Sequence, residues 1–190
     1  MRTAMGRIVW MSVFVASTVF AEGRVGTLSD VAVIQNGHGF ARVLFRAGGL
    51  ADLGNVAISG ATLRISTVGV PQNRAFELRV HPVTRAWNPA SVEWTRGWTR
   101  PGGDFDDELL SMARLDLRGG AAEVAFDVTG LMKEILESGM DAHGFILTVA
   151  PEEGVGLRLE DLPRFAGLAT ASLDVRYRKM PPPPSRRGNR

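Results

Sequence analysis

Apolar and polar residues alternate with a period of two in one segment after another of this chain. Neighbouring side chains of an extended strand point to opposite faces, so the alternation predicts strands with one buried face and one solvated face. The segments are 31–35, 41–47, 59–69, 76–84, 113–118, 122–129 and 171–179, and an apolar run at 143–151 adds one more. Glycine, proline and asparagine separate them, and this succession of short strands predicts an all-β fold, an antiparallel β-sandwich of the jelly-roll type.

The same alternation predicts which side chains form the core. The expected inward faces are Ala61, Leu63, Ile65 and Thr67; Phe76, Leu78, Val80 and Pro82; Val124, Phe126 and Val128; and Leu173, Val175 and Tyr177. Glu77, Arg79 and His81 are expected on an outer, polar face. Segment 143–151, "HGFILTVAP", is apolar without alternation, which predicts a strand buried on both sides.

One segment has helical spacing instead. In "DVTGLMKEILESGMDAHG" the apolar residues Leu131, Met132, Ile135 and Leu136 recur at three- and four-residue intervals. Thr129 is suited to cap the start and Gly139 to end the helix. We therefore expect one short helix packed against the sandwich, with Asp127 bonding the adjacent loop or capping the helix through Thr129.

The two ends of the chain differ in composition from its body. Residues 1–21 combine Arg2 and Arg7 with an apolar run and a small-residue cleavage site, which predicts a signal peptide and export. Residues 180–190 hold four prolines and three arginines, typical of an extended, disordered tail.

The charge balance of the predicted domain, 22–179, differs from that of the whole chain. The two ends contain five of the 22 lysines and arginines, which leaves 17 basic against 20 acidic residues in the domain. That balance argues against nucleic-acid binding, and the apolar run is too short for a comfortable membrane span, so none is expected after signal cleavage. The predicted location is secreted, either extracellular or periplasmic.

Residues 92–108, "VEWTRGWTRPGGDFDDE", hold the most unusual composition in the chain. The first half is interpreted as the end of a core strand and the second half as a long ordered loop. In that loop Trp98 offers an aromatic surface, while Arg96 and Arg100 offer guanidinium groups that bind a carboxylate through two hydrogen bonds. With Asp104 they form the predicted ligand-binding set. The alternative is that Trp98 is pinned to the edge of the sandwich and the arginines pair with acids of the same loop.

The acidic part of this loop also has the chemistry of a calcium site. Asp104, Asp106, Asp107 and Glu108 supply the hard oxygen atoms that Ca²⁺ prefers. Their spacing is not that of an EF-hand. A solvated acidic turn explains the same residues, so a structural Ca²⁺ and a plain turn both stay open. No other cofactor is predicted.

Several stretches resemble, in order, the conserved pattern of the DNRLRE family of secreted modules. These are "ARVLFRAGGL", "ISGATLRIST", "LRVHPVTRAWNPASVEW", "GWTRPGGDFDDE", "VAFDVTGLMKEILESG" and "HGFILTV". The resemblance covers residues 41–177 and implies an exported, non-catalytic jelly-roll sandwich. It also implies that Trp87 and Trp94 lie at strand ends and pack into the core. Some relatives are grouped with carbohydrate-binding modules, and binding of alginate-type glycans is known among them.

Two functions follow from these observations. The first is a secreted, non-catalytic module that binds polysaccharide at the cell surface or in the extracellular matrix. The second is a structural or assembly protein of the cell envelope, which meets a protein partner through the sandwich surface or an open edge strand. A hydrolase is disfavoured, because no pair of acids and no nucleophile motif stands out.

Overall fold

The computed structural model describes residues 21–36, 38, 40–47, 53–68, 75–116, 121–137, 143–149 and 171–180. Residues 1–20 of the predicted leader 1–21, the predicted helix end at Gly139 and residues 181–190 of the predicted tail 180–190 lie outside these ranges. The elements are β1 (Ala21–Gln35), β2 (Ala41–Ala47), β3 (Val56–Val68), β4 (Ala75–Pro82), β5 (Ser111–Asp116), β6 (Ala121–Asp127), α1 (Thr129–Glu137), β7 (Phe145–Val149) and β8 (Ser172–Lys179). No helix in the described ranges has the length and apolar character needed to span a bilayer.

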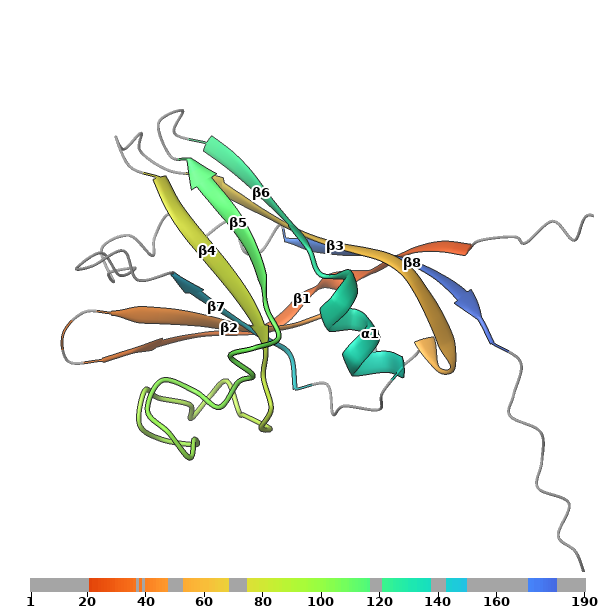
Figure 1. Ribbon diagram of the computed structural model, residues 1–190. Coiled ribbons are helices and arrows are strands. Elements are labelled where there is room, and N and C mark those ends of the chain that lie inside the picture. The colour runs from red at the N-terminus through yellow and green to blue at the C-terminus, as the bar shows by residue number, and fades with distance from the viewer. Residues whose placement is uncertain are drawn as a thin grey trace, which may run out of the picture.

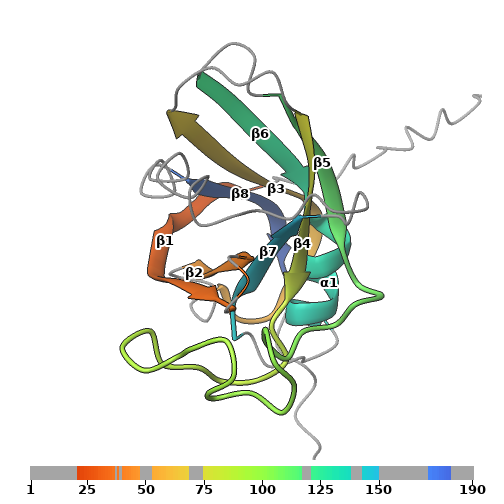
Figure 2. The same ribbon diagram turned by 90° about the vertical axis from the view of Figure 1, so that its left-hand side faces the viewer.

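The strand pairing is that of a long hairpin rolled up on itself. β1 pairs with β8, β2 with β7, β3 with β6 and β4 with β5, all antiparallel. Rolling adds the pairs β1–β2, β3–β8 and β4–β7. In the described residues this gives a five-stranded sheet, β5-β4-β7-β2-β1, packed on a three-stranded sheet, β8-β3-β6 (Figures 1 and 2). The prediction of a jelly-roll sandwich with one short helix is confirmed.

The first strand is longer than the alternation predicts, because it serves both sheets. The sequence places a strand at 31–35, but β1 begins at Ala21. Its first half pairs with β8 from Ala21↔Tyr177 to Thr27↔Ser172, and its second half pairs with β2. The register shifts between Ser29 and Ala32, where Asp30 takes a left-handed conformation with φ of 50°. Such a bulge breaks the period of two, so the pattern fails to reveal the strand before it.

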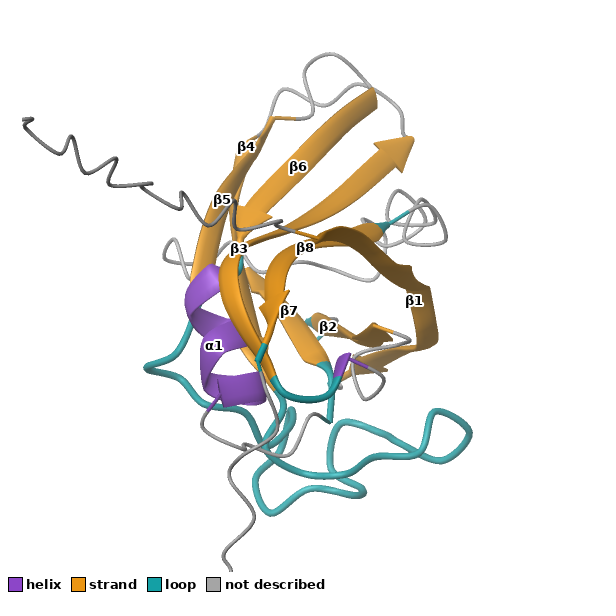
Figure 3. Ribbon diagram, turned by 90° about the vertical axis from the view of Figure 1, so that its right-hand side faces the viewer, coloured by secondary structure: helices purple, strands orange, loops and turns teal. Residues whose placement is uncertain are grey.

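The inward faces form one main core, as predicted. It contains Ala61, Leu63 and Ile65 of β3, Leu78 and Val80 of β4, Val124 and Phe126 of β6 with the adjoining Val128, and Leu173 and Val175 of β8. Helix α1 lies against β3 and adds Leu131, Met132 and Ile135 to this core (Figure 3). Asp127 accepts hydrogen bonds from the Thr129 amide and hydroxyl at 3.0 and 2.6 Å, which confirms its predicted capping role.

The five-stranded sheet also buries part of its outer face. Strand β7 is buried on both sides, as predicted: Phe145 and Leu147 face the main core, and Ile146 faces a second cluster. That second cluster consists of Ala32, Ile34, Leu44, Val83, Trp87 and Ile146, with Val92, Trp94, Trp98 and Phe105 packed against it. It lies between the sheet and residues 83–110, called the β4–β5 loop below, which folds under the β1–β2 hairpin (Figures 1 and 3).

This loop corrects two sequence predictions. Residues 92–94 are not the end of a core strand, because the β4–β5 loop has no strand of its own beyond the isolated bridge Val83↔Phe105. His81 points outward from β4 as predicted but is buried, with 4% of its surface exposed, because the loop covers it. Trp87 is buried as the resemblance implies, although in the second cluster and not in the main core.

Candidate functional site: the β4–β5 loop

The β4–β5 loop is the tip of the rolled hairpin, so both of its ends start from paired strands. Its two arms stay together for several residues beyond the strands. The Thr84 amide donates to the Asp104 carbonyl at 3.0 Å, and the Asp106 amide donates to the Pro82 carbonyl at 3.2 Å. The backbone of the loop is therefore an ordered extension of the hairpin.

Arg42 of β2 fastens one arm of the loop to the sheet. Its guanidinium lies 5.0 Å from the ring centres of both Trp94 and Phe105, and Nη1 donates to the Gly102 carbonyl at 2.6 Å. Burial lowers the pKa of Arg42, and the charge of Arg100 lowers it further. The stacking between two rings and the hydrogen bond offset that cost.

Arg46 of β2 fastens the other arm through Trp87. Its guanidinium stacks on the indole at 4.7 Å, donates to the Trp87 carbonyl and pairs with Asp30 at 2.8 Å. The indole Nε1 donates to the His143 carbonyl at 2.7 Å. Both the ring face and the ring nitrogen of Trp87 are thus engaged, so this tryptophan is a fixed part of the loop's base.

Two members of the predicted ligand set are engaged within the loop. Trp98 donates through Nε1 to the Glu93 carbonyl at 2.9 Å and packs on the second cluster. Arg100 donates to the Gly103 carbonyl at 3.2 Å, pairs with Asp107 at 2.8 Å and stacks on Phe105 at 4.7 Å. These contacts match the alternative raised from the sequence, a pinned indole and an arginine satisfied by its own loop.

Asp104 also serves the loop. It is 8% exposed and accepts hydrogen bonds from the Thr99 amide at 2.8 Å, the Thr99 hydroxyl at 2.6 Å and the Arg100 amide at 3.1 Å. Burial alone would raise the pKa of this carboxyl, but the hydrogen bonds from Thr99 and Arg100 together hold the pKa below its ordinary value. Asp104 is an ionised anchor for the turn at 99–104, with little surface left for a ligand.

The four carboxylates predicted to bind calcium are not brought together. Asp106 accepts from the Glu108 and Leu109 amides at 2.9 and 3.1 Å, and Asp107 faces Arg100. Throughout the described ranges, no three or more acidic or histidine side chains gather as a metal site would require. Asp104, Asp106 and Asp107 are instead bonded to backbone amides or to arginine, as carboxylates of an acidic turn are.

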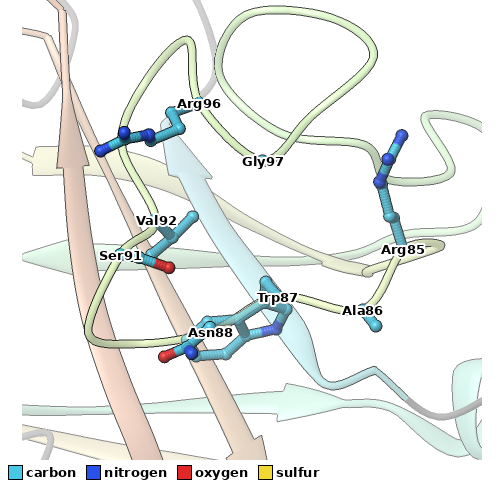
Figure 4. A pocket seen from close by; sticks show the side chains of 8 residues that line it. All are labelled: Arg85, Ala86, Trp87, Asn88, Ser91, Val92, Arg96 and Gly97. Atoms are coloured by element: carbon cyan, nitrogen blue, oxygen red, sulfur yellow. The ribbon is translucent and has the colours of Figure 1, made fainter.

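Arg96 is the predicted residue that does face a recess. An open hollow of about 510 Å³ lies within the first part of the loop, residues 85–97. It is lined by Arg85, Ala86, Trp87, Asn88, Ser91, Val92, Arg96 and Gly97 (Figure 4). Arg85 and Arg96 stand on opposite sides, with side chains 50% and 70% exposed. No acidic residue belongs to this lining, so its charged groups are all cationic.

The sequence holds a signal for this hollow that the strand-based interpretation misses. The tetrapeptide Thr-Arg-X-Trp occurs twice, at 84–87 and 95–98. In each copy the tryptophan fixes the backbone through its indole N–H, and the arginine two residues earlier lines the hollow. Asn88 and Ser91 lie in the turn between the two copies, which is why they share this recess.

No family model matches the chain, and no curated protein matches it either. The resemblance to DNRLRE modules therefore stays a prediction from the quoted stretches. The fold and the site define the protein physically, as a jelly-roll sandwich whose longest described loop builds a hollow lined by two arginines.

Proposed function

We propose that this protein is a secreted, non-catalytic module that binds an acidic polysaccharide at the cell surface or in the extracellular matrix. The observation that carries the proposal is the hollow, which Arg85 and Arg96 line from opposite sides and which has no acidic lining residue. The predicted leader supports the location, and the resemblance supports the ligand class.

The chemistry of the lining favours an anionic sugar over a neutral one. Guanidinium groups bind carboxylate or sulfate through paired hydrogen bonds. Asn88 uses its side-chain oxygen to accept from the Ala90 amide at 2.9 Å, which leaves its NH₂ group as a donor. The hydroxyl of the exposed Ser91 adds a polar group for sugar hydroxyls. The volume falls within the range of roughly 300–1,000 Å³ that small-molecule sites have.

The binding site proposed here differs from the set predicted from sequence. Arg96 is kept, and Arg85, Asn88 and Ser91 replace Trp98, Arg100 and Asp104 as direct contacts. The replaced residues shape the loop. Substitution of Trp98 is therefore expected to disturb the loop itself, which makes it a poor test of ligand contact.

Affinity electrophoresis in gels that contain a polyuronate or a neutral glucan tests the proposal. We expect the polyuronate to retard the native protein and the glucan to leave its migration unchanged. Arg85→Gln and Arg96→Gln should each weaken retardation, whereas Arg114→Gln, an exposed arginine of β5 outside the hollow, should not. Absence of retardation, or equal loss in all three variants, would refute the proposal, and self-association without glycan binding would favour the assembly function instead.

A further inference from the structure

The two arginines of the hollow are held in different ways. Arg85 lies 3.7 Å from Asp104, a buried carboxylate that is already fixed by Thr99 and Arg100. Arg96 lies 3.4 Å from Glu93, and these two side chains are 70% and 63% exposed. The partner of Arg85 is thus held by other hydrogen bonds, whereas the partner of Arg96 is an exposed surface carboxylate.

The backbone beneath the Glu93–Arg96 pair is fixed. The Glu93 amide donates to the Arg96 carbonyl at 3.3 Å, and the Glu93 carbonyl accepts from the Trp98 indole at 2.9 Å. The turn therefore keeps its shape whether or not the two side chains are paired. Only the rotamers of Glu93 and Arg96 need to change for the guanidinium to exchange partners.

We infer that Glu93 competes with the ligand for Arg96 and sets the affinity of the hollow for acidic sugars. In the free protein the Glu93 carboxylate occupies the Arg96 guanidinium at the rim of the hollow. An anionic group that enters the hollow takes over this guanidinium, and Glu93 turns to solvent. This inference rests on the proposed function, because it concerns the same hollow and the same class of ligand.

The energies allow such an exchange. An exposed ion pair contributes about 0.2–1 kcal/mol, so a ligand that also contacts Arg85 readily displaces Glu93. The same range gives the cost that Glu93 imposes on binding. Removing its charge is expected to raise the affinity for an acidic sugar by about 1.4-fold to fivefold, by the usual conversion of free energy to binding constant.

Glu93→Gln tests the inference, with Glu123→Gln as the matched control. The side chain of Glu123 in β6 is 58% exposed and lies 3.7 Å from Arg64 of β3. Glu123→Gln therefore removes the same charge and a similar surface ion pair outside the β4–β5 loop. Dissociation constants for a defined oligouronate would be measured by titration calorimetry in about 0.1 M salt, where charges more than about 10 Å apart are largely screened.

We expect tighter binding for Glu93→Gln only, and no gain when Glu93→Gln is added to Arg96→Gln. Equal affinities of the native protein and Glu93→Gln would overturn the inference while leaving the proposed function intact. An equal gain in Glu123→Gln would also overturn it, since the effect would then come from net charge. If neither the native protein nor Glu93→Gln binds, both the inference and the proposed function fail.

Discussion

Arg42 is expected to control whether the β4–β5 loop stays on the sheet. Its side chain reaches from β2 between the rings of Trp94 and Phe105 and bonds the Gly102 carbonyl. Arg42→Ala removes all three contacts at once. The main core lies on the other face of the sheet and does not contain this side chain, so the loss should be confined to the loop.

The magnitude follows from the contacts. A hydrogen bond from a charged donor contributes about 1.5–3 kcal/mol, and each cation–π contact about 0.5–1 kcal/mol. These contributions are not additive, because the two rings and the carbonyl position one another. We therefore take about 2 kcal/mol as the lower bound, which raises the population of the open loop about 30-fold.

Limited trypsin digestion measures this population, because the bonds after Arg85 and Arg96 are trypsin cleavage sites within the loop. Proteolysis under native conditions tracks local opening when the loop recloses faster than it is cut. Arg42→Ala should speed cleavage in the loop by about 30-fold or more, while Arg114→Ala, which also removes one cleavage site, should leave it unchanged. Equal cleavage rates in the two variants would refute the role of Arg42 in holding the β4–β5 loop against the sheet.

Two further predictions concern the same loop. Gly102 has φ of +88°, and an added Cβ would lie 2.6 Å from Arg42 Nη1, so Gly102→Ala should lower the unfolding midpoint in urea. Gly97 has φ of +91° with open space around it, so Gly97→Ala should lower the midpoint less. A larger drop for Gly97→Ala than for Gly102→Ala would contradict the packing around Gly102. Burial lowers the pKa of His81, whose Nε2 faces the Thr148 hydroxyl at 3.3 Å. Because the folded pKa is below the unfolded one, the stability due to neutral His81 is present above pH 6.5 and is lost as the pH falls through the folded pKa. Thermal melts should show this loss in the native protein and a flatter pH profile in His81→Gln, and parallel profiles would count against a buried neutral imidazole.

Much of the fold follows from local pattern. Alternation in β3, β6 and β8 predicts the buried faces that the structure shows, because a strand buries whichever face is apolar. The spacing of Leu131, Met132 and Ile135 predicts α1 for the same reason. Alternation fails in the first half of β1, where the strand changes from one sheet to the other through a bulge at Asp30.

The candidate site was predicted less well than the fold. The sequence concentrates Trp98, Arg100 and Asp104 in one stretch, but it does not show that each already has partners inside the loop. A hydrogen bond or an ion pair depends on the path of the loop, and the composition of the loop does not specify that path. The sequence analysis selected Arg96 as a ligand-binding residue. It did not select Arg85, because Arg85 directly follows the predicted strand 76–84 and lies outside the stretch 92–108.

The sequence by itself determined most of the strands, the helix and most of the main core, because these depend on the periodicity of neighbouring residues. Only the tertiary structure decided that the outer face of the five-stranded sheet is covered. That covering buries His81 and Ile146, stacks Arg42 and Arg46 on loop aromatics, and places Arg85 opposite Arg96. The physical reason is that these contacts join segments distant in sequence, and they form only after the hairpin has rolled up and carried its tip back onto the sheet.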